Sequence, residues 1–370
     1  MKDTHILIFE HDIVKYPPIL SFISFLFQEN KKIVLIGYCS DEYFIRDFID
    51  NGGVYYNVID NKLEDNIVKK MFRYLLFKKR VKGIVKEFDE KYCRIYFFGE
   101  KCAWLLYTIV SNYSSVIYLF ETPTFVVELK YRLLSPMLNY KEVLQRAYKV
   151  VCCEYNRAHI TKSYFSLKEL PIIIPNKPIV KSVEKKDISE LEDLVDKKVI
   201  LYQGIFNYPE RKLDEFCLAM EYLPEDYVLC LMGGDNKYKA ILKSKYSSDR
   251  IRFLNYVTPP MHLQITEMAY IGILVYNSGG NNISETLNTL YCAPNKIYEY
   301  SKFSIPMISN DVPALDFLFK KFKCGEISCD EAQSIASKIL EIDKFYSNYS
   351  KGSTLLYNSV DLRELYFKIS

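Results

Sequence analysis

Lys296 and Glu299 stand three residues apart in the segment APNKIYEY, between an Ala-Pro-Asn turn and the apolar run IPMIS. The pattern predicts a helix from about Lys296 to Ser301, capped by Asn295, with Lys296 and Glu299 on one face. The N–H groups of a first helical turn bind anions together with a lysine, and a carboxylate accepts hydrogen bonds from hydroxyl groups. The segment can therefore hold a phosphate beside a sugar. The alternative is an ion pair between the two side chains, worth only about 0.2–0.5 kcal/mol.

A second candidate anion site lies in the segment LYQGIFNYPERKLDEF. Gly204 ends a predicted strand, and Arg211 and Lys212 follow seven and eight residues later, where we expect a helix to begin. A helix N-terminus and two cations together favour a bound anion. The alternative is a solvated Arg-Lys pair at the start of a surface helix.

Two more polar segments follow predicted strands in the same half of the chain. Gly233 and Gly234 in LCLMGGDNKY permit a tight turn, and a turn without a ligand is an equal alternative. Asn281 and Asn282 lie in a long polar loop after IGILVY, and such loops often carry binding residues. For these asparagines the alternative is a surface excursion with no ligand.

Several catalytic signatures are absent from the sequence. It contains no GxGxxG turn, no GxxxxGK[ST] phosphate loop, no HExxH and no GxSxG motif. No two aspartates are separated by a single residue, so an Asp-x-Asp metal site is missing. The ten cysteines include no CxxC pair, and the four histidines lie far apart: His5, His11, His159 and His262. We therefore expect no metal ion and no other cofactor.

Length and composition predict a two-domain protein of the reducing cytosol. The chain has 370 residues, which is more than a single hydrophobic core usually organises. The 49 Lys and Arg nearly balance the 46 Asp and Glu, and the many Tyr and Phe accompany no recognition motif, so no nucleic-acid partner is expected. The acidic N-terminus MKDTHILIFEHD and the lack of about 18 consecutive apolar residues argue against export and membrane spanning.

Short apolar runs alternate with helix-length amphipathic segments, as in parallel βαβ units. The runs are HILIFE, KIVLIGY, VYYNVI, RIYFFG, SVIYLFE, KVVCCE and PIIIP, followed by VILYQG, YVLCLMGG, RIRFLN, IGILVY and IPMIS. The predicted fold class is α/β, with doubly wound Rossmann-like domains over residues 1–178 and 198–345 and a charged linker over 179–197. Residues 346–370 are expected to form closing helices that return to the first domain. Ligands of such folds bind beyond the carboxyl ends of the strands, so we expect the site in a central cleft.

With these segments in place, the chain resembles the GT-B glycosyltransferases, most of all the family-4 type that builds bacterial surface polysaccharides such as O-antigen and capsule. The resemblance covers most of the chain. It is carried by YQG with the Arg-Lys pair, the LMGG turn, IRFLNYVTPPMH with IGILVY, and above all APNKIYEYSKFSIPMISND. Weaker similarity to the family occurs in the segments ETPTF, CEYNRAHI and IIIPNKP. Such enzymes commonly carry two glutamates eight positions apart; Glu299 matches the second, which binds the nucleotide ribose, and Tyr291 stands at the first.

The resemblance implies transfer of a sugar from a nucleotide-sugar donor to a glycan or lipid-linked glycan, with retention of configuration and without metal. Arg211 corresponds to the basic residue that holds the donor diphosphate, with Lys296 as a second contact. Both are expected to stabilise the negative charge of the leaving group. The expected donor site is completed by Gly204, Lys212, Gly233, Asn295 and Glu299.

For the acceptor, Glu121 at the end of SVIYLFE is the first candidate to orient or deprotonate the hydroxyl group, and His11 is the second. Asn281 and Asn282 are expected to contact the acceptor as well. Capping of neighbouring helices is the alternative role for Glu121 and His11.

Residues 67–86, IVKKMFRYLLFKKRVKGIVK, contain eight Lys or Arg and no acid. A basic amphipathic helix of this kind binds anionic membranes, which would place the protein at the inner face of the cytoplasmic membrane. The alternative is a helix with its apolar stripe in the core and its lysines in water.

Two other functions of the protein stay open. One is a nucleotide-sugar epimerase on the same architecture. The other is a non-catalytic glycan- or nucleotide-binding scaffold, which the departure at Tyr291 favours.

Overall fold

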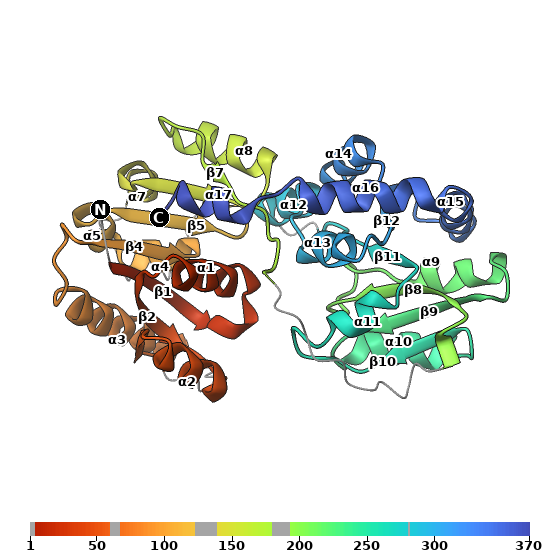
Figure 1. The fold of residues 1–370 in the computed structure, drawn as a ribbon, viewed down its shortest axis with the longest axis horizontal. Helices are drawn as coiled ribbons and strands as arrows, with labels where there is room; N and C mark the ends of the chain where they lie inside the picture. Colours follow the sequence, from red (N-terminus) through yellow and green to blue (C-terminus); the bar gives the residue numbers. More distant parts are fainter. Residues whose placement is uncertain (1–3, 60–66, 123–138, 180–192, 280–281) are drawn as a thin grey trace. The chain divides into compact units, whose positions relative to one another are not determined.

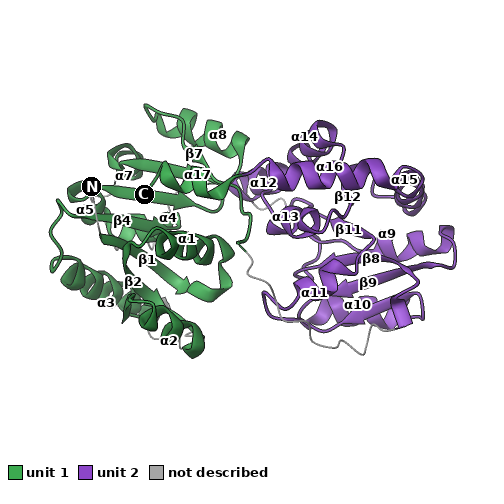
Figure 2. Ribbon diagram, in the orientation of Figure 1, with its two compact units in different colours: residues 1–179, 361–370 green, residues 180–360 purple. Residues whose placement is uncertain are grey.

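The structure is a computed structural model that describes residues 4–59, 67–122, 139–179, 193–279 and 282–370 (Figure 1). Its contacts divide the chain into two compact units (Figure 2). Unit 1 comprises residues 1–179 and 361–370, and unit 2 comprises residues 180–360. Each unit is built on a parallel sheet with helices on both faces.

The sheet of unit 1 has seven strands in the order β3-β2-β1-β4-β5-β6-β7. All seven predicted runs of the first half form these strands: β1 (Thr4–Asp12), β2 (Lys32–Tyr38), β3 (Val54–Asn57), β4 (Cys93–Phe98), β5 (Ser115–Leu119), β6 (Lys149–Cys152) and β7 (Ile172–Ile173). The direction of strand addition reverses between the neighbours β1 and β4. In doubly wound sheets ligands bind at this switch point, beyond the carboxyl ends of the strands.

Both faces of this sheet are buried, which explains why its strands read as continuous apolar runs. Along β1, Ile6 and Ile8 face one core cluster, whereas the alternate residues Leu7 and Phe9 lie outside that cluster but are also buried. The first face is covered by apolar side chains from α3 (Ile67–Val85), α4 (Glu100–Leu105), α5 (Tyr107–Asn112), α7 (Tyr140–Arg146) and α8 (Tyr155–Phe165). The remaining elements of unit 1 are η1 (Ile13–Lys15), α1 (Pro17–Gln28), α2 (Glu42–Asp50) and α17 (Leu362–Phe367).

Aromatic side chains of α1 and α17 pack together on the other face of the sheet. The Phe22 ring lies 4.8 Å from the ring of Tyr96 on β4 and 5.1 Å from that of Tyr366 on α17. The Tyr96 hydroxyl donates to the Ile369 carbonyl at 3.1 Å, so the end of the chain is anchored to unit 1.

The six-stranded sheet of unit 2 repeats the same order as β10-β9-β8-β11-β12-β13. The five predicted runs form β8 (Lys198–Gln203), β9 (Tyr227–Met232), β10 (Ile251–Leu254), β11 (Ile271–Leu274) and β12 (Met307–Asn310). The edge strand β13 (Gly325–Ser328) was missed, because GEIS is short and carries a glutamate instead of an apolar run. Here the switch point lies between β8 and β11.

The helices of unit 2 cover both faces of its sheet. They are α9 (Asp214–Ala219), η3 (Met220–Tyr222), α10 (Lys237–Tyr246), α11 (Leu263–Glu267), α12 (Ile283–Leu290), α13 (Asn295–Lys302), α14 (Pro313–Phe322), α15 (Ala332–Lys344) and α16 (Tyr346–Asn358). Alternate residues of β8 face two different clusters: Leu201 packs with α13, α14 and α16, and Ile200 packs with α9 and α15. The α/β fold with two Rossmann-like domains is therefore confirmed.

The expected closing segment, residues 346–370, is divided between the units. The helix α16 belongs to unit 2, and only residues 361–370 with α17 return to unit 1. Most of the expected linker, residues 180–192, lies outside the described residues. None of the described helices is both long enough and apolar enough to cross a membrane.

Candidate functional site

The candidate donor site lies in unit 2, where α13 approaches the carboxyl end of β8. Tyr300 anchors α13: its ring packs against Gly272, where a side-chain carbon would lie 2.5 Å from it, and its hydroxyl donates to the Leu201 carbonyl at 2.8 Å. Lys296 and Glu299 precede Tyr300 on the same helix. The sheet therefore fixes the place of both candidate side chains.

Lys296 lies against the backbone of Gly204, the residue that follows β8. A side-chain carbon added at Gly204 would lie 2.9 Å from Cε and 3.0 Å from Nζ of Lys296. Gly204 also has a φ of +155°, which side-chain-bearing residues rarely adopt. The backbone conformation thus favours glycine here, and any side chain at this position would displace the end of Lys296.

Arg211 is a second cation, close enough to Lys296 to interact with it electrostatically. Its guanidinium lies 4.2 Å from the centre of the Tyr276 ring and donates to the Glu210 carbonyl at 3.0 Å. That carbonyl also accepts the N–H of Asn277 at 2.9 Å, which ties the Arg211 loop to the segment after β11. Arg211 therefore sits at the switch point between β8 and β11.

The two cations influence each other electrostatically. Burial lowers the pKa of the Lys296 ammonium; the charge of Glu299 opposes this, and the charge of Arg211 lowers the pKa further. Within the described part of the chain, neither Lys296 nor Arg211 forms an ion pair at bonding distance. Two adjacent cations without such partners are suited to hold a diphosphate.

Glu299 is buried, and its carboxylate is contacted by two polar side chains. One carboxylate oxygen, Oε2, accepts a hydrogen bond from Gln203 Nε2 at 2.7 Å, and Oε1 lies 3.4 Å from His262 Nε2. Burial alone would raise the pKa of the Glu299 carboxyl. The hydrogen bonds from His262 and Gln203 and the charges of His262 and Lys296 nevertheless hold this pKa below its ordinary value. Glu299 is therefore an ionised acceptor.

Two local predictions about helix starts are wrong. The residue before α13 is Pro294, with an extended ψ of 139°, so Asn295 is already helical and no side chain caps the helix. Arg211 lies in a turn, Lys212 lies in the irregular stretch that follows it, and α9 begins only at Asp214. Acidic residues suit the positive end of a helix dipole better than Arg and Lys do.

The other expected donor residues have structural contacts. Lys212 Nζ lies 3.6 Å from Glu215 Oε1. Gly233 packs so tightly that a side-chain carbon there would come within 2.0 Å of the Gly204 carbonyl oxygen. The Gly233 carbonyl accepts from the buried Lys239 Nζ at 2.7 Å. These contacts favour an architectural role for the glycine turn.

The two asparagines expected at the acceptor side are not brought to a described cavity. Asn281 lies outside the described residues. Asn282 caps α12, because its side chain accepts from the N–H of Glu285 at 2.9 Å. The role of both residues in acceptor binding stays a prediction.

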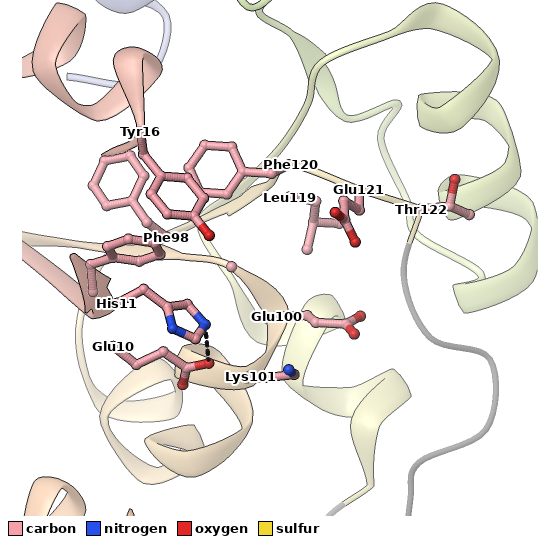
Figure 3. A pocket seen from close by; sticks show the side chains of 12 residues that line it. Glu10, His11, Tyr16, Phe98, Glu100, Lys101, Leu119, Phe120, Glu121 and Thr122 are labelled. Carbon is pink, nitrogen blue, oxygen red and sulfur yellow. Dashed lines mark ion pairs between the residues drawn. The ribbon is translucent and has the colours of Figure 1, made fainter. Parts of the chain in front are cut away.

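In unit 1, Glu121 and His11 line one cavity of about 230 Å³ beyond the carboxyl ends of β1, β4 and β5 (Figure 3). Its walls are formed by Phe9, Glu10, His11, Tyr16, Phe98, Gly99, Glu100, Lys101, Leu119, Phe120, Glu121 and Thr122. The cavity lies at the switch point of the unit 1 sheet. The two predicted acceptor residues are therefore brought to one cavity, although they stand 110 positions apart in the sequence.

Glu10 was missed by the sequence analysis. Its Oε1 lies 3.3 Å from His11 Nε2, and its Oε2 is buried without a hydrogen-bond partner among the described residues. Burial raises the pKa of the Tyr16 hydroxyl in the same cavity, and the charges of Glu121 and Glu10 raise it further. The cavity thus carries several carboxylates suited to bind hydroxyl groups.

Gln203, Thr266 and His262 were also missed in the donor site. Thr266 Oγ1 donates to Gln203 Oε1 at 2.7 Å and so extends the contacts of Glu299. Gln203 and His262 stand in the quoted segments LYQG and TPPMH, but nothing in either segment points to Glu299. Only the packing of α11 and α13 against β8 brings these residues together.

No protein-family model matches the chain, and no curated protein matches it. Solved structures do match over nearly the full length. HepE of Anabaena, solved in complex with UDP-glucose, is 12% identical, with a TM-score of 0.67 over 99% of this chain and 98% of that chain. WaaG, a glycosyltransferase involved in lipopolysaccharide biosynthesis, is 11% identical, with a TM-score of 0.62 over 99% and 98%.

A candidate UDP-N-acetylglucosamine 2-epimerase from Listeria monocytogenes is 10% identical, with a TM-score of 0.64 over 100% of this chain and 95% of that chain. Likeness at these identities shows the fold alone. The two Rossmann-like domains of this chain match those of GT-B glycosyltransferases.

Proposed function

We propose that this protein is a glycosyltransferase that moves a sugar from a nucleotide-sugar donor to a glycan or lipid-linked glycan. The observation that carries the proposal is that Lys296 lies against Gly204 after β8 and interacts electrostatically with both Arg211 and Glu299. The family-4 resemblance adds retention of configuration, independence of metal and a role in bacterial surface polysaccharide synthesis.

The two cations stabilise the leaving diphosphate in this proposal. As the bond from the anomeric carbon to the phosphate oxygen breaks, negative charge grows on the diphosphate. Arg211 and Lys296 face no carboxylate at bonding distance among the described residues, so their donors are available to that charge. Each charge-assisted hydrogen bond made only in the transition state contributes about 10- to 100-fold in rate.

Glu299 binds the ribose of the donor. Its carboxylate is ionised and buried, and each of its oxygens can accept a further hydrogen bond beside those from Gln203 and His262. Two adjacent ribose hydroxyls match the two oxygens of one carboxylate. The nucleotide is thus fixed at its sugar by Glu299 and at its diphosphate by Arg211 and Lys296.

The cavity of unit 1 receives the acceptor. Glu121 and His11 line it, and either can orient the attacking hydroxyl or take its proton (Figure 3). If the leaving phosphate helps to take that proton, as in retaining front-face transfer, Glu121 and His11 serve mainly to orient the acceptor.

The helix α3 carries the proposed membrane contact. Tyr74, Phe77 and Val81 are buried in the unit 1 core, whereas Phe72 and Leu75 are 61% and 48% exposed. A helix with its whole apolar stripe in the core would not leave these two exposed. Exposed apolar side chains among basic ones favour contact with anionic lipid. The protein would then act at the cytoplasmic membrane surface.

A panel of nucleotide sugars tests the proposal. The purified protein is incubated with UDP-, GDP-, ADP- and dTDP-sugars, with and without a membrane glycolipid extract, and donor consumption and acceptor products are measured. We expect one donor to be bound and its sugar to be transferred. Binding without conversion of any donor in the presence of the extract would favour a non-catalytic scaffold, and failure to bind any donor would overturn the proposal.

A nucleotide-sugar epimerase is the second candidate, because one of the matching structures is a candidate UDP-N-acetylglucosamine 2-epimerase. An epimerase needs acid and base groups around a sugar carbon and no acceptor. Conversion of the donor to its epimer without any extract would identify this activity, and transfer that requires the extract would exclude it.

A further inference from the structure

A relay of buried polar side chains ends on Glu299. Thr266 Oγ1 donates to Gln203 Oε1 at 2.7 Å, and Gln203 Nε2 donates to Glu299 Oε2 at 2.7 Å. Thr266, Gln203 and Glu299 are 0%, 3% and 7% exposed. The relay joins three elements that are distant in sequence: the end of β8, α11 and α13.

The relay has a fixed direction. The ionised Glu299 carboxylate can only accept, so the NH₂ end of the Gln203 amide faces it and the amide oxygen faces Thr266. The Thr266 hydroxyl donates to this oxygen at 2.7 Å, and the His262 carbonyl, 3.1 Å away, is its other acceptor. Without the Thr266 hydroxyl, the Gln203 amide oxygen would lose its donor, and the Gln203 side chain would be held by Glu299 alone.

His262 reaches the other oxygen of the carboxylate. It immediately precedes α11, and its Nε2 lies 3.4 Å from Glu299 Oε1. Because the ionised carboxylate only accepts, Nε2 must carry the proton in this contact. Gln203 and His262 therefore hold one carboxylate oxygen each, which fixes the plane of the Glu299 carboxylate.

We infer that Gln203, Thr266 and His262 are positioning residues that hold the Glu299 carboxylate in the plane required to accept two adjacent ribose hydroxyls. In this role they set the preference of the site for ribonucleotides over 2′-deoxyribonucleotides. The inference rests on the proposed function, since it takes the donor to be a nucleotide whose ribose meets Glu299.

A purely structural role explains the relay less well. Burying a carboxylate and an amide costs free energy, and apolar residues of similar volume often stabilise a core as well or better. A relay that fixes the orientation of one carboxylate has a clear use where two hydroxyl groups must be recognised together. Bidentate recognition depends on such geometry as much as on charge.

The test measures ribose discrimination. Binding of UDP, GDP and ADP, and of the 2′-deoxy form of each, is measured by isothermal titration calorimetry with the full-length protein. We expect the best-bound ribonucleotide to bind about 10- to 100-fold more tightly than its 2′-deoxy form, which lacks one charge-assisted hydrogen bond.

Isosteric variants probe the relay without touching the ligand. In Thr266→Val and in Gln203→Met we expect the ratio of ribo- to deoxynucleotide affinity to fall at least threefold, mostly through weaker binding of the ribonucleotide. Thr266→Ser keeps the hydroxyl and should keep the wild-type ratio. The double variant Thr266→Val with Gln203→Met also lacks the Gln203 amide that Thr266→Val leaves without a donor. It should behave like Gln203→Met alone, because both residues act on Glu299 through the same hydrogen bond from Gln203.

The outcomes separate the inference from the proposed function. A reduced ratio in both single variants, with the wild-type ratio in Thr266→Ser, supports the relay. Unchanged ratios, or equal loss of affinity for both forms of the nucleotide, would overturn it while leaving the donor site in place. A wild-type protein that binds none of the six nucleotides would refute the proposed donor site, and with it the basis of the inference.

Discussion

At the scale of single residues, the candidate donor site combines two cations, which have no carboxylate at bonding distance among the described residues, with one carboxylate held by two polar side chains. Arg211 is held by an aromatic ring and a backbone carbonyl, and Lys296 lies over Gly204. Such cations repel each other when the site is empty and attract a diphosphate when it is present. Replacing either cation by a neutral residue should therefore lower the activity but raise the stability of the unliganded protein.

Arg211→Ala should lower the rate of sugar transfer about 10- to 100-fold, because the leaving diphosphate loses one charge-assisted hydrogen bond. Lys243→Ala is the matched control, since Lys243 is an exposed cation on α10 of the same unit. The measurement is kcat/KM for the donor identified in the panel. Equal rates for both variants and the wild type would contradict a role for Arg211.

Lys296→Met should weaken donor binding but stabilise the unliganded protein. The pKa of Lys296 is lowered, so its charge costs folding free energy at pH 7. This cost falls as the pH rises through the folded-state pKa and is gone above the unfolded-state value of about 10.4. Its place in the first turn of α13 adds about 0.3–1 kcal/mol of dipole repulsion, or roughly 1–4 °C in Tm. Thermal melts at pH 7 and pH 10 provide the check: the variant should melt higher at pH 7, and the difference should shrink at pH 10. A lower Tm for Lys296→Met at pH 7 would be inconsistent with this reading.

At the scale of elements, α13 and α3 show how one helix can serve both packing and recognition. Tyr300 fixes α13 to the sheet, and this packing determines where Lys296 and Glu299 of the same helix lie. In α3 the buried side is set by Phe77, while Phe72 on another side of the helix is exposed. A helix with two apolar sides can pack on a core and still offer an apolar surface.

Substitution of Phe72 and Leu75 by serine should abolish most binding to vesicles of anionic phosphatidylglycerol. Lys79→Gln with Lys86→Gln should weaken that binding about 10- to 30-fold, since each basic residue near the surface contributes roughly 1 kcal/mol. Leu355→Ser on α16 is the control, because Leu355 is comparably exposed in unit 2. Co-sedimentation at low and high salt measures the binding. Equal recovery with neutral and anionic vesicles would count against the membrane contact.

At the scale of the whole molecule, the chain ends by returning to the unit in which it began. Tyr366 of α17 is buried against Phe22 and Phe25 of α1, with ring distances of 5.1 Å and 5.3 Å. Unit 1 is therefore completed only when the last ten residues have docked. Its stability should depend on them, and that of unit 2 should not.

Tyr366→Ala should destabilise unit 1 by about 3–5 kcal/mol, as expected for a buried aromatic side chain. Phe367→Ala is the control, because Phe367 is half exposed at the next position. Urea unfolding followed by hydrogen exchange would assign the loss to residues of unit 1, with exchange in unit 2 unchanged. A similar loss in both variants would show that the burial of Tyr366 is not what matters.

The sequence by itself predicted the fold class, twelve of the thirteen strands of the described residues and the central residues of the candidate donor site. Apolar runs report strands because both faces of a parallel sheet are buried, and this signal is local. Gly204 and Arg211 follow such a run, and Lys296 and Glu299 precede one. Residue type and strand ends were sufficient to find them.

The tertiary structure alone decided what surrounds those residues. Gln203, His262 and Thr266 meet Glu299 from different segments, and Glu10 joins His11 and Glu121 in one cavity. The helix starts at Asn295 and Asp214 also differed from the local pattern. Side chains that act together in a buried site are neighbours through packing and not through sequence spacing, so no local pattern can reveal them.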